Sequence, residues 1–309
     1  MAIRHHIGLE ISEQSFQFVE VRIVDEAPLI LHAERIRTSR DFSAQLLHEA
    51  PFHKDLAKAF ISDMTSLCQR QNLLASAISV ALPISACLVT TVPVDSRLSE
   101  SERTEQFEWE CRTLMSLSPD TKVRVLSQPM QKMDDGERHL LVAFPEATLV
   151  FLSSVLAHLT FTIQSIEPNH FVQENSILQH ERLNAGSGFA VCGLFDSCCS
   201  VGVYENDCYR GFRSGIVSYK QQLSSTVLLH LENILNEHHN TRIDTLHLFG
   251  PSATEQMEST FRQLLHIEVR RCDLTTTVPF ASQAGEAAAL KEKPFTFDTA
   301  LRAALRNAE

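Results

Sequence analysis

The spacing of hydrophobic residues predicts one succession of strands and helices that occurs twice along this chain of 309 residues. In the first part, β-forming residues placed among polar ones predict three strands, followed by a helix and a buried strand. These elements cover residues 5–12, 14–24, 27–38, 53–72 and 75–83. The helix has one apolar face, because its hydrophobic residues are spaced by three or four positions. They are Leu56, Phe60, Met64 and Leu67.

The last 120 or so residues repeat this order, beginning with three short strands of a hairpin series. The predicted strands and helices cover residues 189–196, 198–207, 208–215, 219–239, 243–250, 253–265 and 267–272. The long helix carries its own apolar stripe, made of Leu223, Val227, Leu231 and Ile234. Two copies of one order predict a duplicated α/β architecture.

An extra module separates the two copies. Strands are predicted at 85–94, 121–130 and 138–145, and a helix begins near Ser99, where Glu102 completes a capping box. A helix and a strand then follow, up to residue 168. We therefore divide the chain into a first subdomain at 1–84, an inserted subdomain at 85–166, a return and linker at 167–186, and a second subdomain at 187–309 with a short helix at 217–239. Near the C-terminus, Phe297, Leu301, Ala304 and Leu305 share one face, which favours a helix docked on the core over a membrane anchor.

Composition restricts the classes of partner. The formal net charge is −11, which argues against nucleic acid, because a nucleic-acid binder needs a basic face. No apolar run reaches the roughly 18 residues of a membrane-spanning helix, and the N-terminus lacks the apolar core of a secretory signal. We therefore expect a cytoplasmic protein without direct membrane insertion.

The common motifs of nucleotide, metal and nucleophile sites are missing. The ten glycines make up about 3% of the chain against a usual ~7%, and neither GxGxxG nor GxxxxGK[ST] occurs. CxxC, HExxH and GxSxG are absent as well. Neighbouring histidines occur at His5–His6 and at His238–His239, the latter at the end of a predicted helix, and neighbouring histidines rarely face one metal ion from a helix. We expect no catalytic residue and no metal.

Four stretches carry a resemblance to a known family. They are "IGLEISEQSFQFVEV" at 7–21, "SVALPISACLVTTVPV" with "LSESERTEQFEWECRTLMSLSPDTKVRVLSQPM" up to residue 130, "HLLVAFPEATLVFLSSVLAHLTFTIQSIEPNHFVQENSIL" at 139–178, and "FAVCGLFDSCCSVGVYENDCYRGFRSG" at 189–215. In order and spacing they resemble PilM, the type IV pilus assembly family related to FtsA. The resemblance implies an actin-like (ribonuclease H-like) duplicated fold with an inserted FtsA/PilM-type subdomain. Only about 28 residues separate Gly215 from the next strand, so subdomain 2B of the family is reduced or absent.

The first phosphate hairpin of the family is altered here. Glu10, Ser12 and Gln17 stand where the family has Asp, Gly and Lys. Glutamate is one methylene longer than aspartate, and Ser12 adds a Cβ to a turn that lies against phosphate in the family. Gln17 lacks the positive charge of the family's lysine, which could offset the charge of a phosphate.

The second hairpin and the adenosine motif are altered too. Gly193-Leu194-Phe195 replaces Asp-x-Gly, so an aromatic ring fills the phosphate space, with Asp196 next to it. Gly215 keeps one glycine of a pair, and Gly250 is followed by Pro251, which has no N–H to donate. We expect no cofactor. The alternative is ATP with Mg²⁺, in which Glu10 and Asp196 would serve the metal.

The resemblance also implies a partner. PilM-like proteins are scaffolds that bind the cytosolic N-terminal peptide of a single-pass inner-membrane assembly protein, PilN, and GspL of type II secretion has a similar actin-like cytosolic domain. The candidate partner-binding residues here are Cys87, Val89, Phe107 and Trp109, for which core packing is the alternative. A partner of this kind would make the protein peripheral to the inner membrane. A functional actin-like ATPase and an FtsA-like, self-associating filament former are the alternative functions.

Overall fold

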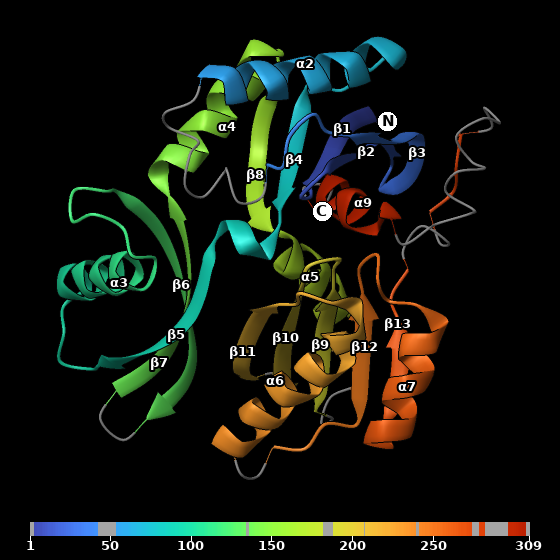
Figure 1. Cartoon of the computed structure of the whole chain (residues 1–309). Coiled ribbons are helices and arrows are strands. Elements are labelled where there is room, and N and C mark those ends of the chain that lie inside the picture. Colours follow the sequence, from blue (N-terminus) through green and yellow to red (C-terminus); the bar gives the residue numbers. More distant parts are fainter. Residues whose placement is uncertain are drawn as a thin grey trace. The chain divides into compact units, whose positions relative to one another are not determined.

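The computed structural model describes residues 3–42, 54–133, 136–181, 188–206, 208–238, 241–273, 278–281 and 296–306. The chain forms two compact units. The first contains Met1–Ala86, Ala147–Gln173 and Asp273–Glu309, and the second contains Cys87–Glu146 and Glu174–Cys272. Each unit is therefore assembled from segments that are far apart in sequence (Figure 1).

The first unit is built on a five-stranded sheet in the order β3-β2-β1-β4-β8. Its strands are β1 (Ile3–Ile11), β2 (Ser15–Val24), β3 (Ala27–Arg37), β4 (Ala77–Leu82) and β8 (Thr162–Pro168). The first three are antiparallel, whereas β4 and β8 run parallel to β1. The helices are α2 (Lys54–Arg70), α4 (Glu146–His158) and α9 (Asp298–Leu305), with the 3-10 turn η1 (Ile84–Ala86) after β4 and the start of α5 (Asn169–Glu181) after β8.

Strand β2 is buried on both faces because its sequence is apolar in both phases. Phe16 faces α2, and its ring centroid lies 5.0 Å from that of Phe60. Val19 and Val21, an odd number of positions away, belong to the apolar cluster that α9 closes through Leu301. Because successive side chains of a strand point to opposite faces, α2 and α9 cover opposite faces of this sheet.

The second unit repeats the same topology. Its five-stranded sheet has the order β11-β10-β9-β12-β13, formed by β9 (Phe189–Leu194), β10 (Cys198–Glu205), β11 (Cys208–Ile216), β12 (Thr245–Phe249) and β13 (Glu268–Arg271). The 3-10 turn η2 (Lys220–Gln222) leads into α6 (Leu223–Glu237), and α7 (Glu255–Leu265) follows β12. Both helices pack on one face of this sheet, where the predicted stripe of α6 is fully buried (Figure 1). The predicted duplication is confirmed, and a single helix, α6, occupies the interval between β11 and β12.

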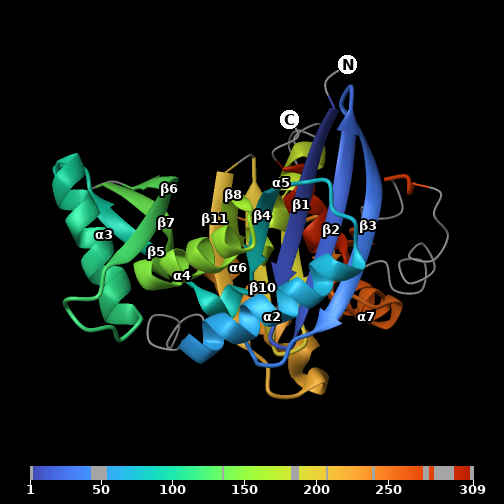
Figure 2. The ribbon, with the colours of Figure 1, turned by 90° about the horizontal axis from the view of Figure 1, so that it is seen from above.

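The inserted module belongs to the second unit. It consists of β5 (Leu88–Asp95), α3 (Glu100–Leu114), β6 (Val123–Met133) and β7 (Gly136–Pro145), with the strand order β5-β7-β6. Helix α3 lies against this small sheet through Phe107 and Cys111 (Figure 2). The predicted capping box is present, since the Ser99 side chain accepts from Glu102 N and the Glu102 carboxylate accepts from Ser99 N.

Several boundaries differ from the sequence-based division. The segment from α4 to β8, which we placed in the inserted subdomain at 85–166, belongs to the first sheet, because Ile163 of β8 pairs in parallel with Ile78 of β4. Helix α9, which we placed in the second subdomain at 187–309, packs on β1 and β2 instead, as a docked helix. The return and linker that we expected at 167–186 contains a helix, α5 (Asn169–Glu181), and its residues 182–186 lie outside the described residues.

Candidate functional site

The turn between β1 and β2, where the first phosphate hairpin was expected, is closed by its own hydrogen bonds. Ser12 N donates to Ser15 O at 2.9 Å, and the hydroxyl groups of these two serines lie 2.7 Å apart. Gln17 Nε2 and Arg35 Nε both donate to the Ser15 hydroxyl, at 3.2 and 3.1 Å. The polar groups that would have to face a phosphate are thus engaged within the hairpin.

Glu10 is a buried carboxyl group rather than an exposed metal ligand. Only 4% of the residue is exposed, and this burial raises the pKa of its carboxyl to about 8. Hydrogen bonds with Asn169 and Thr299 oppose the shift, whereas the neighbouring Asp298 adds to it. At neutral pH the group is therefore largely protonated, and a neutral carboxylic acid is a weak ligand for Mg²⁺.

The second hairpin, between β9 and β10, is filled by aromatic side chains. The Phe195 ring is buried and meets the Phe249 ring edge to face at a centroid distance of 5.9 Å. A Cβ added to Gly193 would lie 2.7 Å from the Phe195 ring and 2.8 Å from the Phe249 ring. Glycine at 193 is therefore required by the packing of these two rings.

Asp196 and Gly250 lie next to this hairpin. Asp196 is exposed, and the Ser252 hydroxyl donates to it at 3.5 Å. Gly250 adopts a φ of 94°, and a Cβ there would be 2.6 Å from Leu194 O. Ser252 N donates to the same carbonyl at 3.0 Å, so the loop after β12 is tied to the second hairpin through its main chain.

Gly215, near the end of β11, makes room for a side chain of α6. A Cβ at this position would lie 2.6 Å from His230 Nε2. The three candidate glycines, which all belong to the second unit, are thus explained by side-chain or main-chain packing around them.

The four partner-binding candidates fall into two groups. Cys87 and Phe107 are core side chains. Phe107 lies in the centre of the inserted module, with its ring centroid 5.3 Å from that of His139. Val89 is partly buried on β5, and Trp109 is 60% exposed on α3. Trp109 and Val89 are therefore the two that are accessible to a partner.

Arg35 was not identified from the sequence as part of the first hairpin. It brings a cation there, because it stands opposite Gln17 in the β2–β3 ladder.

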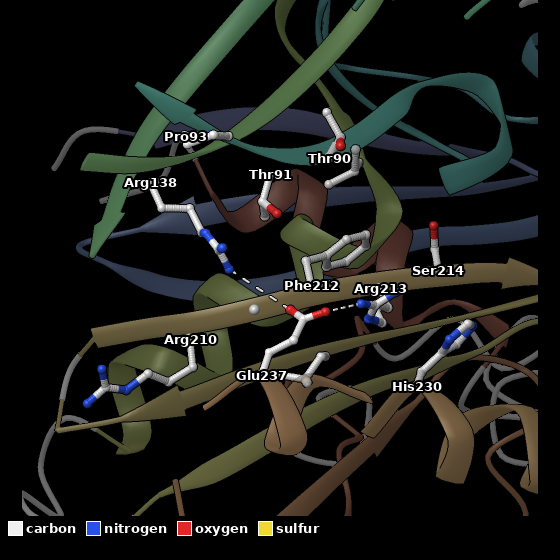
Figure 3. A pocket seen from close by; sticks show the side chains of 13 residues that line it. Thr90, Thr91, Pro93, Arg138, Arg210, Phe212, Arg213, Ser214, His230 and Glu237 are labelled. Carbon is white, nitrogen blue, oxygen red and sulfur yellow. Dashed lines mark hydrogen bonds and ion pairs between the residues drawn. The ribbon is translucent and has the colours of Figure 1, made fainter. Parts of the chain in front are cut away.

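A cavity of about 360 Å³ in the second unit was not predicted either, and we call it the β5–β11 cavity. Its lining residues are Val89, Thr90, Thr91, Pro93, Arg138, Arg210, Gly211, Phe212, Arg213, Ser214, His230, Ile234 and Glu237 (Figure 3).

The described residues contain no group of three or more His, Cys, Asp or Glu side chains that could hold a metal ion. His239, one of the histidines considered above, lies outside the described residues. Among the helices that the structure describes, none has the length and hydropathy needed to cross a bilayer.

Comparison with solved structures identifies the class of fold. No protein-family model matches the sequence, and no curated protein matches it. The structure is similar to a Bacteroides thetaiotaomicron protein with an actin-like ATPase fold, at 11% identity, with 89% of this chain and 92% of that chain covered and a TM-score of 0.54. The chain therefore has the actin-like fold that the sequence predicted.

A more similar structure agrees with the resemblance that we found in the sequence. A chain of the PilM–PilN type IV pilus biogenesis complex superposes with a TM-score of 0.73, at 15% identity and with 98% of both chains covered. The cytoplasmic domain of EpsL, an inner membrane component of the type II secretion system of Vibrio cholerae, matches over 94% of each chain at 11% identity with a TM-score of 0.47. The resemblance to PilM is thus confirmed at the level of the fold.

Proposed function

We propose that this chain is a PilM-like scaffold of an inner-membrane assembly platform, of the type IV pilus or type II secretion kind, which neither binds nor hydrolyses ATP. The observation that carries the proposal is the coverage of 98% of both chains in the superposition on the PilM–PilN complex. Proteins that share a fold often differ in function, so the site residues have to support the same role.

The state of the two hairpins supports a scaffold without nucleotide. Glu10 is buried and largely protonated, Ser12 is bonded to Ser15, and the Phe195 ring packs on Phe249. Binding of MgATP would require an ionised Glu10, an open Ser12 turn and a displaced Phe195 ring. Each of these changes costs free energy, because each breaks buried packing or charges a buried group.

Trp109 supports a peptide partner. Its side chain is exposed on α3, while the same helix is anchored to the module by Phe107 and Cys111. An exposed aromatic residue on a rigid element suits a binding anchor. The proposed partner is the cytosolic N-terminal peptide of a single-pass, PilN-like membrane protein, which would hold this chain at the inner membrane.

Two experiments test the proposal. The first is a calorimetric titration with MgATP together with a thermal melt, for which a nucleotide at 100 times its Kd would stabilise the fold by roughly 2.7 kcal/mol. We expect no heat of binding and no stabilisation up to millimolar ATP. Micromolar binding would instead favour the actin-like ATPase, and ATP-independent polymerisation under crowding would favour an FtsA-like filament former.

The second experiment uses Trp109 as a probe, since it is the one tryptophan of the chain. Synthetic cytosolic N-terminal peptides of PilN-like proteins should shift its fluorescence to the blue on binding. In a calorimetric titration the Trp109→Ala variant should bind such a peptide at least tenfold more weakly. Leu229→Ala, which truncates an exposed apolar side chain of α6, is the matched control and should bind as the wild type does.

A further inference from the structure

The β5–β11 cavity lies between two strands that each end a sheet. Strand β11 is the terminal strand of the five-stranded sheet of the second unit, and β5 is the terminal strand of the inserted module. A terminal strand has a row of main-chain N–H and C=O groups that its own sheet does not use, and an extended segment of another chain can pair with them. The cavity therefore opens between main-chain edges that suit an extended peptide.

The charged groups of the cavity leave an excess of positive charge. Glu237, the last residue of α6, accepts from Arg213 through Oε1, and its Oε2 lies 4.0 Å from Arg138 Nη1. Figure 3 shows these two guanidinium groups reaching the carboxylate from opposite sides. Arg210 has a different partner, since its Nη2 lies 3.0 Å from a Glu205 oxygen. One carboxylate is thus shared by two guanidinium groups.

The position of Glu237 is electrostatically unfavourable for a carboxylate. The C-terminal end of a helix carries partial negative charge, which favours cations there. The two arginines offset this effect, and their side chains remain 30% and 39% exposed. Each guanidinium has five donors in a planar fork, so both have capacity for a second carboxylate.

His230 adds a ring nitrogen that can still form a hydrogen bond. Its Nε2 is buried and has no hydrogen-bond partner in the described part of the chain. Burial and the nearby Arg213 lower the pKa of the His230 imidazole, so the ring is neutral at neutral pH. Thr91 and Ser214, on β5 and β11, place hydroxyl groups around the same space.

We propose that the β5–β11 cavity is a second protein-binding site, which accepts an Asp or Glu side chain from an extended segment of a partner protein. The segment pairs with the β11 edge, and its carboxylate binds Arg138 and Arg213 together with, or in place of, Glu237. Arginine favours carboxylates because of its planar, bidentate geometry. This site goes beyond the proposed function, since Trp109 and the turns of the two nucleotide hairpins are not part of its lining, and Val89 is the one partner-binding candidate that it includes.

A pair of synthetic peptides tests the proposal. The probes are the capped peptide acetyl-Thr-Val-Asp-Val-Thr-amide, which favours an extended strand, and the same peptide with Asn in place of Asp. The readout is NMR titration of the full chain. We expect the Asp peptide to bind at least tenfold more tightly than the Asn peptide, with binding weakened by salt and resonance shifts that concentrate on 210–214.

Three variants locate the binding site. Arg213→Gln should weaken binding of the Asp peptide at least tenfold, whereas Glu237→Gln should strengthen it, because it releases both guanidinium groups. Arg97→Gln, which changes an exposed arginine paired with Asp95 outside the cavity, should leave it unchanged. The opposite responses of the first two variants cannot both result from a loss of folding.

Three results would overturn the proposal: equal binding of the two peptides, weaker binding by Glu237→Gln, and displacement of the Asp peptide by equimolar inorganic phosphate. The last would identify the cavity as a site for small anions. None of these results depends on whether the chain binds ATP or a PilN-like peptide.

Discussion

Gly8 of β1 lies directly against Ala300 of α9. A Cβ built on Gly8 would be 1.7 Å from the Ala300 carbonyl oxygen and 2.7 Å from Ala304 N. Both are main-chain atoms of the helix, so no rotation of a side chain could relieve the overlap. The absence of a side chain at residue 8 therefore determines how closely the C-terminal helix approaches the first strand.

The Gly8→Ala substitution should displace α9 from the sheet. We expect the free energy of unfolding to fall by about 3 kcal/mol or more, at the upper end of the range for overpacked cores. Chemical denaturation measures this change. Ile3→Ala, which truncates an exposed side chain on the same strand, is the control and should change stability by less than about 0.5 kcal/mol. An unchanged midpoint for Gly8→Ala would contradict the close packing.

The loss of stability on substitution of Arg302 should depend on whether Asp298 is also replaced. Arg302 Nε donates to Asp298 Oδ2 at 3.0 Å, and both side chains are almost completely buried. Removal of one partner from a buried pair typically costs about 3–5 kcal/mol, whereas replacement of both costs far less. Arg302→Met should therefore destabilise the protein more than the double variant Asp298→Asn/Arg302→Met. If thermal melts rank them in the reverse order, the pair is not coupled in this way.

The pH dependence of stability should reveal Glu10. Its pKa is raised to about 8 in the folded state, so the folded protein binds its proton more tightly than the unfolded chain does. The contribution is complete below the unfolded pKa of about 4.3 and is lost as pH rises to about 8, with a slope of up to ~1.4 kcal/mol per pH unit.

Glu10→Gln, which has a similar shape and no charge, should remove this dependence. The variant should gain stability relative to the wild type as pH rises from 5 to 9, as measured by urea denaturation at each pH. Glu100→Gln, which changes an exposed carboxylate of α3, is the matched control and should follow the wild-type profile. Parallel profiles for Glu10→Gln and the wild type would show that Glu10 is not a buried acid.

The capping box of α3 should contribute measurably to stability. Ser99→Ala removes the side chain that accepts from Glu102 N, and the loss of such a cap typically costs about 1 kcal/mol. Ser154→Ala changes an exposed serine within α4 and should alter stability by less than about 0.5 kcal/mol. Equal midpoints for the two variants in urea would mean that the capping box adds nothing.

Local periodicity was sufficient to predict most helices and strands, α5 excepted, but not which of them pair or pack together. The stripes of α2 and α6 each repeat within one helix, so they can be recognised from a short stretch of sequence. The pairing of Ile78 with Ile163 joins positions separated by a whole inserted module, and no local pattern encodes it. Leu114 continues the spacing of Phe107 and Cys111 in sequence, yet it is exposed, because α3 ends there.

Less of the candidate site than of the fold could be predicted from the sequence. The Phe195 ring is buried against Phe249, and that this ring fills a phosphate space stays a prediction. The protonation of Glu10 was not predicted, because it results from burial, and the neighbouring groups Asn169, Asp298 and Thr299 are remote in sequence. Cys198 and Cys199 are both buried, although successive side chains of β10 point to opposite faces, so both faces of the strand are covered at this point.

The docking of α9 on β1 has a consequence for synthesis of the chain. Val19, Val21 and Ile23 of β2 are synthesised roughly 280 residues before Leu301 of the helix that covers them. At roughly 5–20 residues per second, the apolar face of Val19, Val21 and Ile23 waits on the order of 15–60 s for Leu301 and its neighbours. During that time the apolar face of the nascent first sheet is exposed, and the first unit can be completed only after the segments of the second unit have been synthesised.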